Sequence, residues 1–465
     1  MSVLPAEGVT FDAHVPVAIV GAGACGLIAA LAAHDGGAEA VVFERDASPS
    51  GSTALSSGLI PAAGTRFQTA KGIEDSAELL LADIQRKAHG RADPVVAEAV
   101  ARASAETIEW LIDRHGLEFV LQDSFLYPGH SAFRMHAHPR KTGAALLGAL
   151  LDAARRAGVD IVTSAHVRDL FASSNGRVRG LALRRPHGSE ERIGCDALVL
   201  ACNGYGGNRE MVKRYIPEMA DALYFGHAGN QGDAVRWGVA LGGVAKHMGA
   251  YQGHGSVAHP HAILITWATM MEGGIQVNAK GERFSNEHLG YSEQAMAVLA
   301  QPGRVAWSIF NRHACEIAGE FEDFREAEAA GAIHRAESVS GLAALTGIPE
   351  SALLRTLGEI ERYRRGEAND PFGRDFTGRT PLDAPYFAVK VTGALFHTQG
   401  GLVIDRAARV LRADGTGLPN LFAGGGAACG VSGPDVAGYL SGNGLLTAVN
   451  LGRIAGESAA ATFAK

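Results

Sequence analysis

The feature that most constrains the fold of this chain is a glycine-rich segment close to its start. Residues 15–20 read V-P-V-A-I-V, residues 21–26 read G-A-G-A-C-G, and the helix-forming run L-I-A-A-L-A-A follows at once. An apolar, β-rich run that leads through G-x-G-x-x-G into a helix is typical of a dinucleotide-binding turn. The sequence therefore predicts a Rossmann-type α/β domain in this part of the chain.

The spacing of the three glycines has a physical reason. Gly21 permits a tight turn, Gly23 lets backbone amides approach a pyrophosphate, and Gly26 allows the helix to pack closely on the strand. The next strand, A-E-A-V-V-F-E-R, carries Glu44 about twenty residues downstream, where an acidic side chain accepts the ribose hydroxyls. Strand, turn, helix and acidic residue together predict that a dinucleotide binds here.

The chain returns to the same nucleotide fold at three distant places. Residues 196–208 are a buried strand that runs into glycines, residues 418–426 are a second strand that closes on a glycine turn, and residues 438–449 are the glycine-rich start of a helix. An enzyme that binds a nicotinamide cofactor needs no such return in its C-terminal part. The later segments therefore favour FAD over NAD.

The size and charge of the chain limit its organisation and its partners. A chain of 465 residues is too long for one core, so two structural units are expected, of which one can be inserted into the other. A net charge of −7 with few basic runs leaves no electrostatic footprint for nucleic acid or an anionic membrane surface. We expect a small-molecule partner and no metal, because no Cys or carboxylate spacing supports the histidines around His136 as ligands.

The composition also favours a cytoplasmic protein. The five cysteines are odd in number, scattered and without a C-x-x-C pair, which suits a reducing compartment. No apolar run approaches the roughly 18–20 residues that a membrane helix needs, and the first residues lack the basic and apolar regions of a signal peptide. We therefore expect neither export nor membrane anchoring.

With these motifs, the chain resembles the fumarate reductase and succinate dehydrogenase flavoprotein superfamily, which also contains the 3-ketosteroid dehydrogenases. The resemblance spans nearly the whole chain. Its most specific pieces are G-x-G-x-x-G with Glu44, G-S-T-A-L-S-S-G at 51–58, N-G-Y-G-G-N at 203–208, G-G-I-Q-V-N-A-K-G-E-R-F-S-N-E at 273–287, F-H-T-Q-G-G at 396–401 and the C-terminal glycine helix.

The resemblance implies an α/β fold in which an α+β capping domain is inserted into a Rossmann-type FAD-binding domain. Mapped onto this chain, the FAD-binding domain would comprise residues 1–245 and 386–465, and the capping domain residues 246–385. The substrate would lie between the two domains, against the isoalloxazine ring of the flavin.

The glycine motif and the resemblance together imply a set of cofactor-binding residues. Ser52 falls where the membrane-bound relatives place a histidine that links covalently to FAD, so non-covalent FAD is expected. The full set is Gly21, Gly23, Ala24, Cys25, Gly26, Glu44, Arg45, Ser52, Thr53, Ser57, Gly58, Val167, Ala201, Asn203, Gly204, Asn208, Asp233, Gly401, Gly425, Gly426, Gly442, Asn443 and Leu445.

The resemblance also assigns catalytic positions, with two departures from the fumarate reductases. Those enzymes hold a dicarboxylate with two histidines and an arginine and protonate it through a second arginine, and His254, His397 and Arg283 fall on three of these positions. At the fourth, where the family reads R-L-G-G-N, this chain has Tyr439 in Y-L-S-G-N. The segment W-A-T-M-M-E at 267–272 also lacks the expected proton-relay groups. Loss of a bidentate guanidinium removes the strongest reason to bind a dicarboxylate.

Two tyrosines match the 3-ketosteroid dehydrogenases instead. Those enzymes hold the substrate carbonyl oxygen with a tyrosine and a backbone amide, which here implies Tyr439 with the N–H of Asn443 or Gly444 at a helix N-terminus. They carry their base eight residues after the R-F arginine, where this chain has Tyr291. A neighbour must assist a base whose ordinary pKa is near 10.

Further residues are expected to assist the Tyr291 base or to lie near the substrate. Residues that could assist the Tyr291 base are His254, Arg283 and Tyr127, and residues expected near the substrate are Phe125 and Tyr127. Structural roles stay open for three of the catalytic candidates: an ion pair of Arg283 with Glu287, a core position for His254 and flavin contact for His397.

The sequence therefore predicts an FAD-dependent dehydrogenase that introduces an α,β double bond into a ketone, with a cyclic ketone favoured. A carboxylated ring such as a 4-oxocyclohexane acid stays open, with Arg283, His254 or Arg134 as the group that receives the carboxylate. Two alternatives are an ene-reductase that acts on an unsaturated carboxylic acid with Arg283 as proton donor, and a flavin-binding subunit without turnover. The electron acceptor and the oligomeric state stay open.

Overall fold

The glycine turn of residues 21–26 lies between a strand and a helix, as the sequence predicts. In the computed structural model, which describes residues 1–463, β2 (Ala13–Val20) leads into the turn and α1 (Ala24–Asp35) leaves it. β2 is parallel to β3 (Ala40–Phe43) on one side and to β10 (Glu190–Leu200) on the other. The buried apolar runs of these strands are typical of a parallel sheet that helices cover on both faces.

This first sheet unites segments from both ends of the chain. Over residues 1–463 it has nine strands in the order β1-β8-β9-β10-β2-β3-β7, with β21 on β10 and β20 on β21. The remaining bounds are β1 (Val3–Pro5), β7 (Asp160–Val162), β8 (His166–Ala172), β9 (Val178–Arg184), β20 (Arg409–Leu411) and β21 (Gly417–Ala423). β21 runs parallel to β10, so the C-terminal return is present and the predicted α/β class is confirmed.

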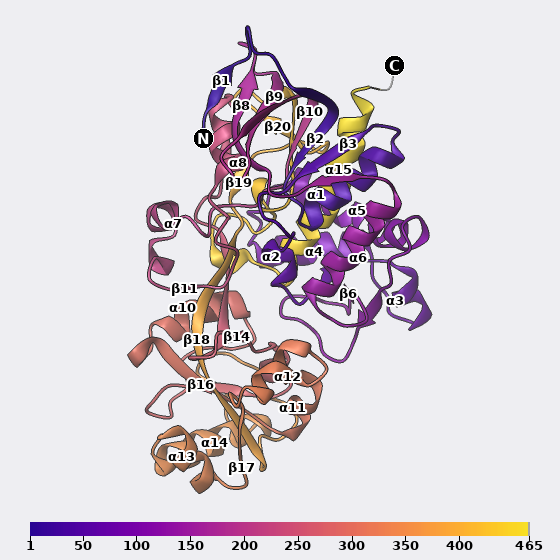
Figure 1. Ribbon diagram of the computed structural model, residues 1–465. Coiled ribbons are helices and arrows are strands. Elements are labelled where there is room, and N and C mark those ends of the chain that lie inside the picture. Colours follow the sequence, from indigo (N-terminus) through magenta and orange to yellow (C-terminus); the bar gives the residue numbers. More distant parts are fainter. Residues whose placement is uncertain (464–465) are drawn as a thin grey trace.

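The last helix of the chain packs directly on the first. α15 (Asn443–Ala461) lies beside α1 in Figure 1, and glycines let their backbones touch. A Cβ atom at Gly452 would lie 2.6 Å from the Cys25 carbonyl oxygen, and one at Gly456 would lie 2.1 Å from the Ala29 carbonyl oxygen. The position of α15 relative to the glycine turn is therefore set by contact between main chains, which cannot shift as flexible side chains do.

Further helices and a small sheet cover this domain. Over residues 1–463, no helix is both long enough and apolar enough to cross a membrane. The bounds are α2 (Gly51–Ala54), α3 (Arg66–Ala70), α4 (Ala77–Lys87), α5 (Pro94–Asp113), α6 (Gly143–Arg156), α7 (Arg209–Tyr215), α8 (Asp233–Ala240), β4 (Ile60–Pro61), β5 (Val120–Gln122) and β6 (Met135–Ala137), with the short pair β12 (Ala245–Lys246) and β19 (Gly401–Leu402).

A second sheet forms the other part of the molecule, in the lower half of Figure 1. Over residues 1–463 it has seven strands, in the order β14-β13-β18-β16-β15, with β11 and β17 also on β18. The bounds are β11 (Leu223–Tyr224), β13 (Tyr251–Ala258), β14 (Ile263–Leu264), β15 (Ile275–Val277), β16 (Val305–Phe310), β17 (His334–Ala336), β18 (Tyr386–Thr398), α9 (Ala268–Met271), α10 (Tyr291–Leu299), α11 (Arg312–Ala318), α12 (Glu322–Ala329), α13 (Val339–Thr346) and α14 (Glu350–Arg364).

The second sheet extends past the limits of 246 and 385 expected for the capping domain. β11 lies before residue 246, and β18, the strand that most others pair with, begins at Tyr386 and continues to Thr398. The reason is the length of β18: its 13 residues, at about 3.3 Å each, reach from the far part of the second sheet back to the first domain. Residues 464 and 465 of the expected second FAD-binding segment lie outside the described residues.

The contact between α15 and α1 gives a prediction about stability. Gly456→Ala should lower the free energy of unfolding by about 1–3 kcal/mol, because the new Cβ meets a main-chain oxygen. Gly358→Ala, within α14 and open to space at its Cβ position, should raise it by about 0.5–1 kcal/mol through helix propensity. Urea unfolding of both variants checks this, and equal effects would contradict the proposed close contact.

Candidate active site

One continuous cavity runs from the glycine turn to the second sheet. Its walls come from the first sheet, from α2 and the start of α15, and from β13, β18 and α10 of the second part. The cavity therefore joins the glycine turn to side chains of the second sheet.

The glycine turn forms one wall of the dinucleotide half because side chains are excluded there. Gly21 has φ +105°, and a Cβ atom at this position would lie 2.7 Å from the Ala201 carbonyl oxygen. Gly26 does not line the cavity, but its Cβ would lie 1.9 Å from the Gly21 carbonyl oxygen. Gly26 therefore has the packing role expected for the third glycine of the motif.

Polar groups next to the turn hold its shape. Glu44 directly follows the strand β3 and accepts a hydrogen bond through Oε2 from the Ala22 backbone N–H at 2.9 Å. The backbone N–H of Ala24, in the first turn of α1, donates to Thr53 Oγ1 at 3.0 Å. A helix N-terminus behind a glycine turn and a carboxylate beside it are the groups that bind a pyrophosphate and a ribose.

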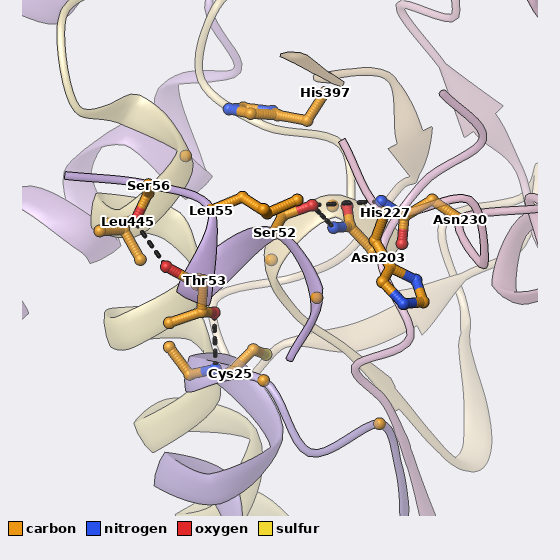
Figure 2. Close-up of a pocket in the computed structure, with 18 of the residues that line it drawn as sticks. Cys25, Ser52, Thr53, Leu55, Ser56, Asn203, His227, Asn230, His397 and Leu445 are labelled. Atoms are coloured by element: carbon orange, nitrogen blue, oxygen red, sulfur yellow. Dashed lines mark hydrogen bonds between the residues drawn. The ribbon is translucent and has the colours of Figure 1, made fainter. Parts of the chain in front are cut away.

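Ser52 lies at the start of α2 in the middle of the cavity. Its Oγ accepts hydrogen bonds from Asn203 Nδ2 at 2.8 Å and from Asn230 Nδ2 at 3.1 Å, as Figure 2 shows. A hydroxyl that two amides hold has none of the chemistry of the histidine that attaches FAD covalently in membrane-bound relatives. The donor set around Ser52 fits a flavin held without a covalent bond.

Most residues expected to bind the cofactor line this cavity. They are Gly21, Gly23, Ala24, Cys25, Glu44, Arg45, Ser52, Thr53, Ser57, Val167, Ala201, Asn203, Asp233, Gly425, Gly426, Gly442 and Leu445. Those that do not line it are Gly26, Gly58, Gly204, Asn208, Gly401 and Asn443.

Contact of these six residues with the cofactor stays a prediction, and the structure shows roles for them within the fold. Asn208, for example, caps α7 by accepting from the Met211 N–H at 3.1 Å, and a Cβ at Gly401 would lie 2.5 Å from the Ala428 carbonyl oxygen. Helix capping and close packing of the main chain therefore account for these residue types even where they make no contact with a ligand.

The other half of the cavity gathers the aromatic residues that the sequence singles out. Tyr127, Tyr291, Tyr439, His254 and His397 all line it. The His254 ring stacks on the Tyr291 ring with centroids 4.6 Å apart, and the Tyr439 ring lies 6.0 Å from Tyr291 and 5.7 Å from His397. Four of them come from β13, β18, the first residue of α10 and the turn before α15, and Tyr127 lies in the loop between β5 and β6, so only the tertiary fold brings them together.

The start of α15 places a backbone amide beside Tyr439. The Gly444 N–H donates to Tyr439 Oη at 3.4 Å, and a Cβ atom at Gly444 would lie only 2.6 Å from His397 Nε2. Gly444 therefore lets the imidazole of His397 approach the end of the helix. Asn443 does not line the cavity, and its Nδ2 donates to Ser432 Oγ, whereas Gly444, the other residue whose amide is expected to contact substrate, lines the cavity.

Burial keeps both cavity histidines uncharged. Removal from water lowers the pKa of His254 to about 3 and that of His397 to about 4. His254 Nδ1 accepts from the Ser256 backbone N–H at 3.2 Å, so the neutral ring carries its proton on Nε2. Neither histidine supplies a positive charge to a ligand at neutral pH.

The three tyrosines differ in how readily they lose a proton. Burial raises the pKa of Tyr127 and of Tyr439 well above the ordinary value, and the neighbouring Tyr291 raises both further. Burial also raises the pKa of Tyr291, but only to about 12, because hydrogen bonding from Ser441, the Gly442 backbone and Tyr439 favours its ionised form. Tyr291 is therefore the tyrosine that ionises first.

Arg283 does not line the cavity, and its expected catalytic role stays a prediction. Its guanidinium pairs with Glu287 at 2.7 Å and with Asp370 at 2.5 Å, and its side chain is 5% exposed. Arg374, which sequence reasoning missed, joins this cluster through Glu287 at 3.0 Å. The ion pair with Glu287, the alternative left open by the sequence, is the arrangement found.

Phe125 also lies outside the cavity lining, so its expected contact with substrate stays a prediction. Its ring packs against Tyr127, with centroids 4.4 Å apart, and against Phe321 at 6.1 Å. Arg134, a candidate to receive a carboxylate, is fully buried and pairs with Asp75 at 2.8 Å and Asp83 at 2.7 Å. The Arg134 guanidinium is therefore engaged by two carboxylates.

The structure adds lining residues that sequence reasoning missed. In the aromatic half these are Leu59, Met135, Phe225, Gln252, Leu264, Thr266, Trp267 and Phe396. The alternation of β13 could have indicated Gln252, which is two positions from His254 on the same face. Among the lining residues within 1–463, the one arginine or lysine is Arg45, next to Glu44 in the dinucleotide half.

The fold and the site define an FAD-dependent oxidoreductase. The FAD binding domain family matches residues 16–445, and the chain belongs to this family. The probable fumarate reductase Ifc3 of Shewanella frigidimarina is 31% identical over 446 residues, which cover 96% of this chain and 74% of the relative. The predicted cofactor FAD and the suspected flavoprotein superfamily are thereby confirmed.

Solved structures of two kinds share the fold. The open conformation of a flavocytochrome c3 fumarate reductase has a TM-score of 0.79 and 29% identity, covering 97% of this chain and 79% of that one. The 3-ketosteroid-Δ4-(5α)-dehydrogenase of Rhodococcus jostii RHA1 in complex with 4-androstene-3,17-dione has a TM-score of 0.76 and 25% identity, covering 98% and 99%. The protein is thus an FAD oxidoreductase that acts on CH–CH groups.

The lowered pKa of His254 predicts how stability depends on pH. Below about 6.5 the unfolded state binds a proton that the folded state refuses, so acidification from pH 6 to 4 should lower the free energy of unfolding. His254→Gln should reduce this slope by about 1.4 kcal/mol per pH unit. Urea unfolding at several pH values checks this, with the exposed His187→Gln as control, and an unchanged slope in His254→Gln would contradict a buried neutral His254.

Proposed function

We propose that this protein is an FAD-dependent dehydrogenase that introduces an α,β double bond into an uncharged, cyclic ketone. One observation carries the proposal: the aromatic half of the cavity presents Tyr127, Tyr291 and Tyr439, and within residues 1–463 no arginine or lysine lines it. Hydroxyl groups and aromatic faces suit a ketone. A dicarboxylate needs cationic partners when it leaves water.

The groups that could have received a carboxylate are engaged elsewhere. Arg283 and Arg134 each pair with two carboxylates outside the cavity, and burial keeps His254 neutral. A buried carboxylate without a counter-charge is strongly disfavoured. The proposal therefore excludes a 4-oxocyclohexane acid and favours a neutral ring.

Tyr439 and Gly444 would hold the carbonyl oxygen. The raised pKa of Tyr439 keeps its hydroxyl protonated and able to donate, and the Gly444 N–H lies at the positive N-terminal end of α15. Two donors aimed at one oxygen stabilise the negative charge that develops there when the α-proton leaves. Gly444 also leaves space for the neutral ring of His397 on the same side.

Tyr291 would remove the α-proton. It is the first residue of α10, it ionises more readily than Tyr127 or Tyr439, and its ring lies against His254. Trp267, Leu59 and Met135 complete an apolar wall that keeps water from the reacting carbon atoms. FAD, when bound, supplies the acceptor for the β-hydride.

An ene-reductase acting on an unsaturated acid is the second candidate. Its support is the similarity to fumarate reductases, including the 31% identical relative from Shewanella frigidimarina. Against it, Arg283 lies outside the cavity and so cannot donate a proton to a molecule there.

A substrate panel separates these candidates. Anaerobic mixing of the oxidised holoenzyme with neutral cyclic ketones, both monocyclic and steroidal, should bleach the flavin absorption band, and fumarate-like acids should not reoxidise the reduced enzyme. Tyr439→Phe should slow bleaching by about two orders of magnitude, because one oxyanion donor is lost. Tyr386→Phe, at the start of β18 and outside the cavity, is the matched control. Failure of every ketone to bleach the flavin would refute the proposal.

Removal of the base gives a further prediction. Because the pKa of Tyr291 is about 12, the rate of flavin reduction in the wild type should rise with pH across the accessible range, by about tenfold per unit. Tyr291→Phe should lose most of this rate and its pH dependence while still binding FAD. Stopped-flow reduction between pH 7 and pH 10 checks both, and a variant that kept the wild-type profile would remove Tyr291 from the mechanism.

A further inference from the structure

A loop of residues 225–231, here called the strap, crosses from the second sheet to the dinucleotide half of the cavity. It follows β11, which pairs with β18. The Phe225 N–H donates to the Leu395 carbonyl oxygen at 2.7 Å, and the Phe225 ring stacks on Phe396 with centroids 4.7 Å apart. Its later residues His227, Gly229 and Asn230 line the cavity. The strap therefore extends along the cavity from the aromatic half to the dinucleotide half.

Side-chain contacts fasten the strap at the dinucleotide half. His227 Nε2 lies 2.9 Å from Asp46 Oδ2, and Arg45 Nη1 donates to the Gly229 carbonyl oxygen at 2.9 Å. Arg45 and Asp46 directly follow Glu44, the acidic residue at the end of β3. The strap is thus attached to the segment that carries the acidic group expected to bind ribose.

A third attachment lies at the middle of the cavity. Asn230 Nδ2 donates to Ser52 Oγ at 3.1 Å and to Tyr224 Oη at 2.9 Å, and Figure 2 shows Asn230, Asn203 and Ser52 together. The Tyr224 hydroxyl in turn donates to the His227 carbonyl oxygen at 3.1 Å. Tyr224 therefore binds the strap at both His227 and Asn230 and stabilises its bend.

The shape of the strap depends on the absence of side chains at its glycines. A Cβ atom at Gly226 would lie 2.5 Å from the Tyr224 ring, and one at Gly229 would lie 2.5 Å from Arg45 Nη1. His227 Nδ1 accepts from the Gly229 N–H at 3.0 Å, so Nε2 carries the proton and donates to Asp46. The hydrogen bond from the Gly229 N–H therefore orients the His227 ring so that Nε2 is directed to Asp46.

We propose that the strap holds FAD in place and that the bond between His227 and Asp46 must break before FAD can leave. The strap and the glycine turn line the same cavity, so a bound dinucleotide lies between them. The side chains of His227 and Asp46 are 25% and 33% exposed, so the bond lies at the surface, where it can open while the rest of the fold stays intact. The inference concerns FAD retention alone, so its outcome is independent of the ketone reaction.

The test measures how fast FAD leaves the holoenzyme. After dilution, the rise of free FAD fluorescence should be about tenfold faster in His227→Ala and in Asp46→Ala than in the wild type, because each removes one partner of the same hydrogen bond. The double variant should be no faster than either single variant, since both remove one bond. His227→Gln, whose amide can still donate, should restore part of the retention.

A matched control separates this effect from general loosening. His313 pairs with Glu272 at 3.1 Å in the second part of the molecule, and neither residue lines the cavity. His313→Ala should leave FAD dissociation unchanged, and the melting temperature of each variant verifies its fold. A dissociation rate of His227→Ala equal to that of His313→Ala, or additive effects in the double variant, would overturn the proposal.

Discussion

The contact between the main chains of α1 and α15 determines the relation between the two halves of the site. α1 begins at the glycine turn, and α15 begins beside Tyr439 and Gly444. Because Gly452 and Gly456 let the two backbones touch, the N-terminus of α15 has little freedom relative to the turn. The groups proposed to hold the carbonyl oxygen are thereby placed at a set position from the groups that bind the dinucleotide. Precise placement of this kind is what hydride transfer to a bound cofactor requires.

The buried ion pairs of arginine with carboxylates lie outside the cavity. Arginine residues with buried carboxylate partners, Arg134 in the first part and Arg283 and Arg374 in the second, lie outside the cavity. The aromatic half keeps neutral histidines and protonated tyrosines. A neutral, dry site strengthens the interaction between a hydroxyl donor and a developing oxyanion, because water does not compete for it.

The sequence predicted the dinucleotide half better than the aromatic half. Gly21, Gly26 and Glu44 lie within one short segment, so their spacing alone reports their geometry. Arg283 shows the opposite case: the motif R-F-S-N-E contains its partner Glu287, but its second partner, Asp370, lies 87 residues away, where no local pattern indicates it. The strap was missed for a similar reason. Its function depends on Asp46 and Ser52, and no local pattern in residues 225–231 indicates those partners.

By itself, the sequence determined the nucleotide-binding turn, the cofactor and the presence of Tyr439 where fumarate reductases carry arginine. These features follow from local requirements, such as a turn that admits no Cβ atom, or from residue types at particular positions. Only the tertiary structure decided which cations face the cavity, where β18 crosses between the two sheets and which amide lies beside Tyr439. Those outcomes depend on how elements that are separate in the chain pack against one another, because burial and hydrogen bonding are properties of the packed molecule.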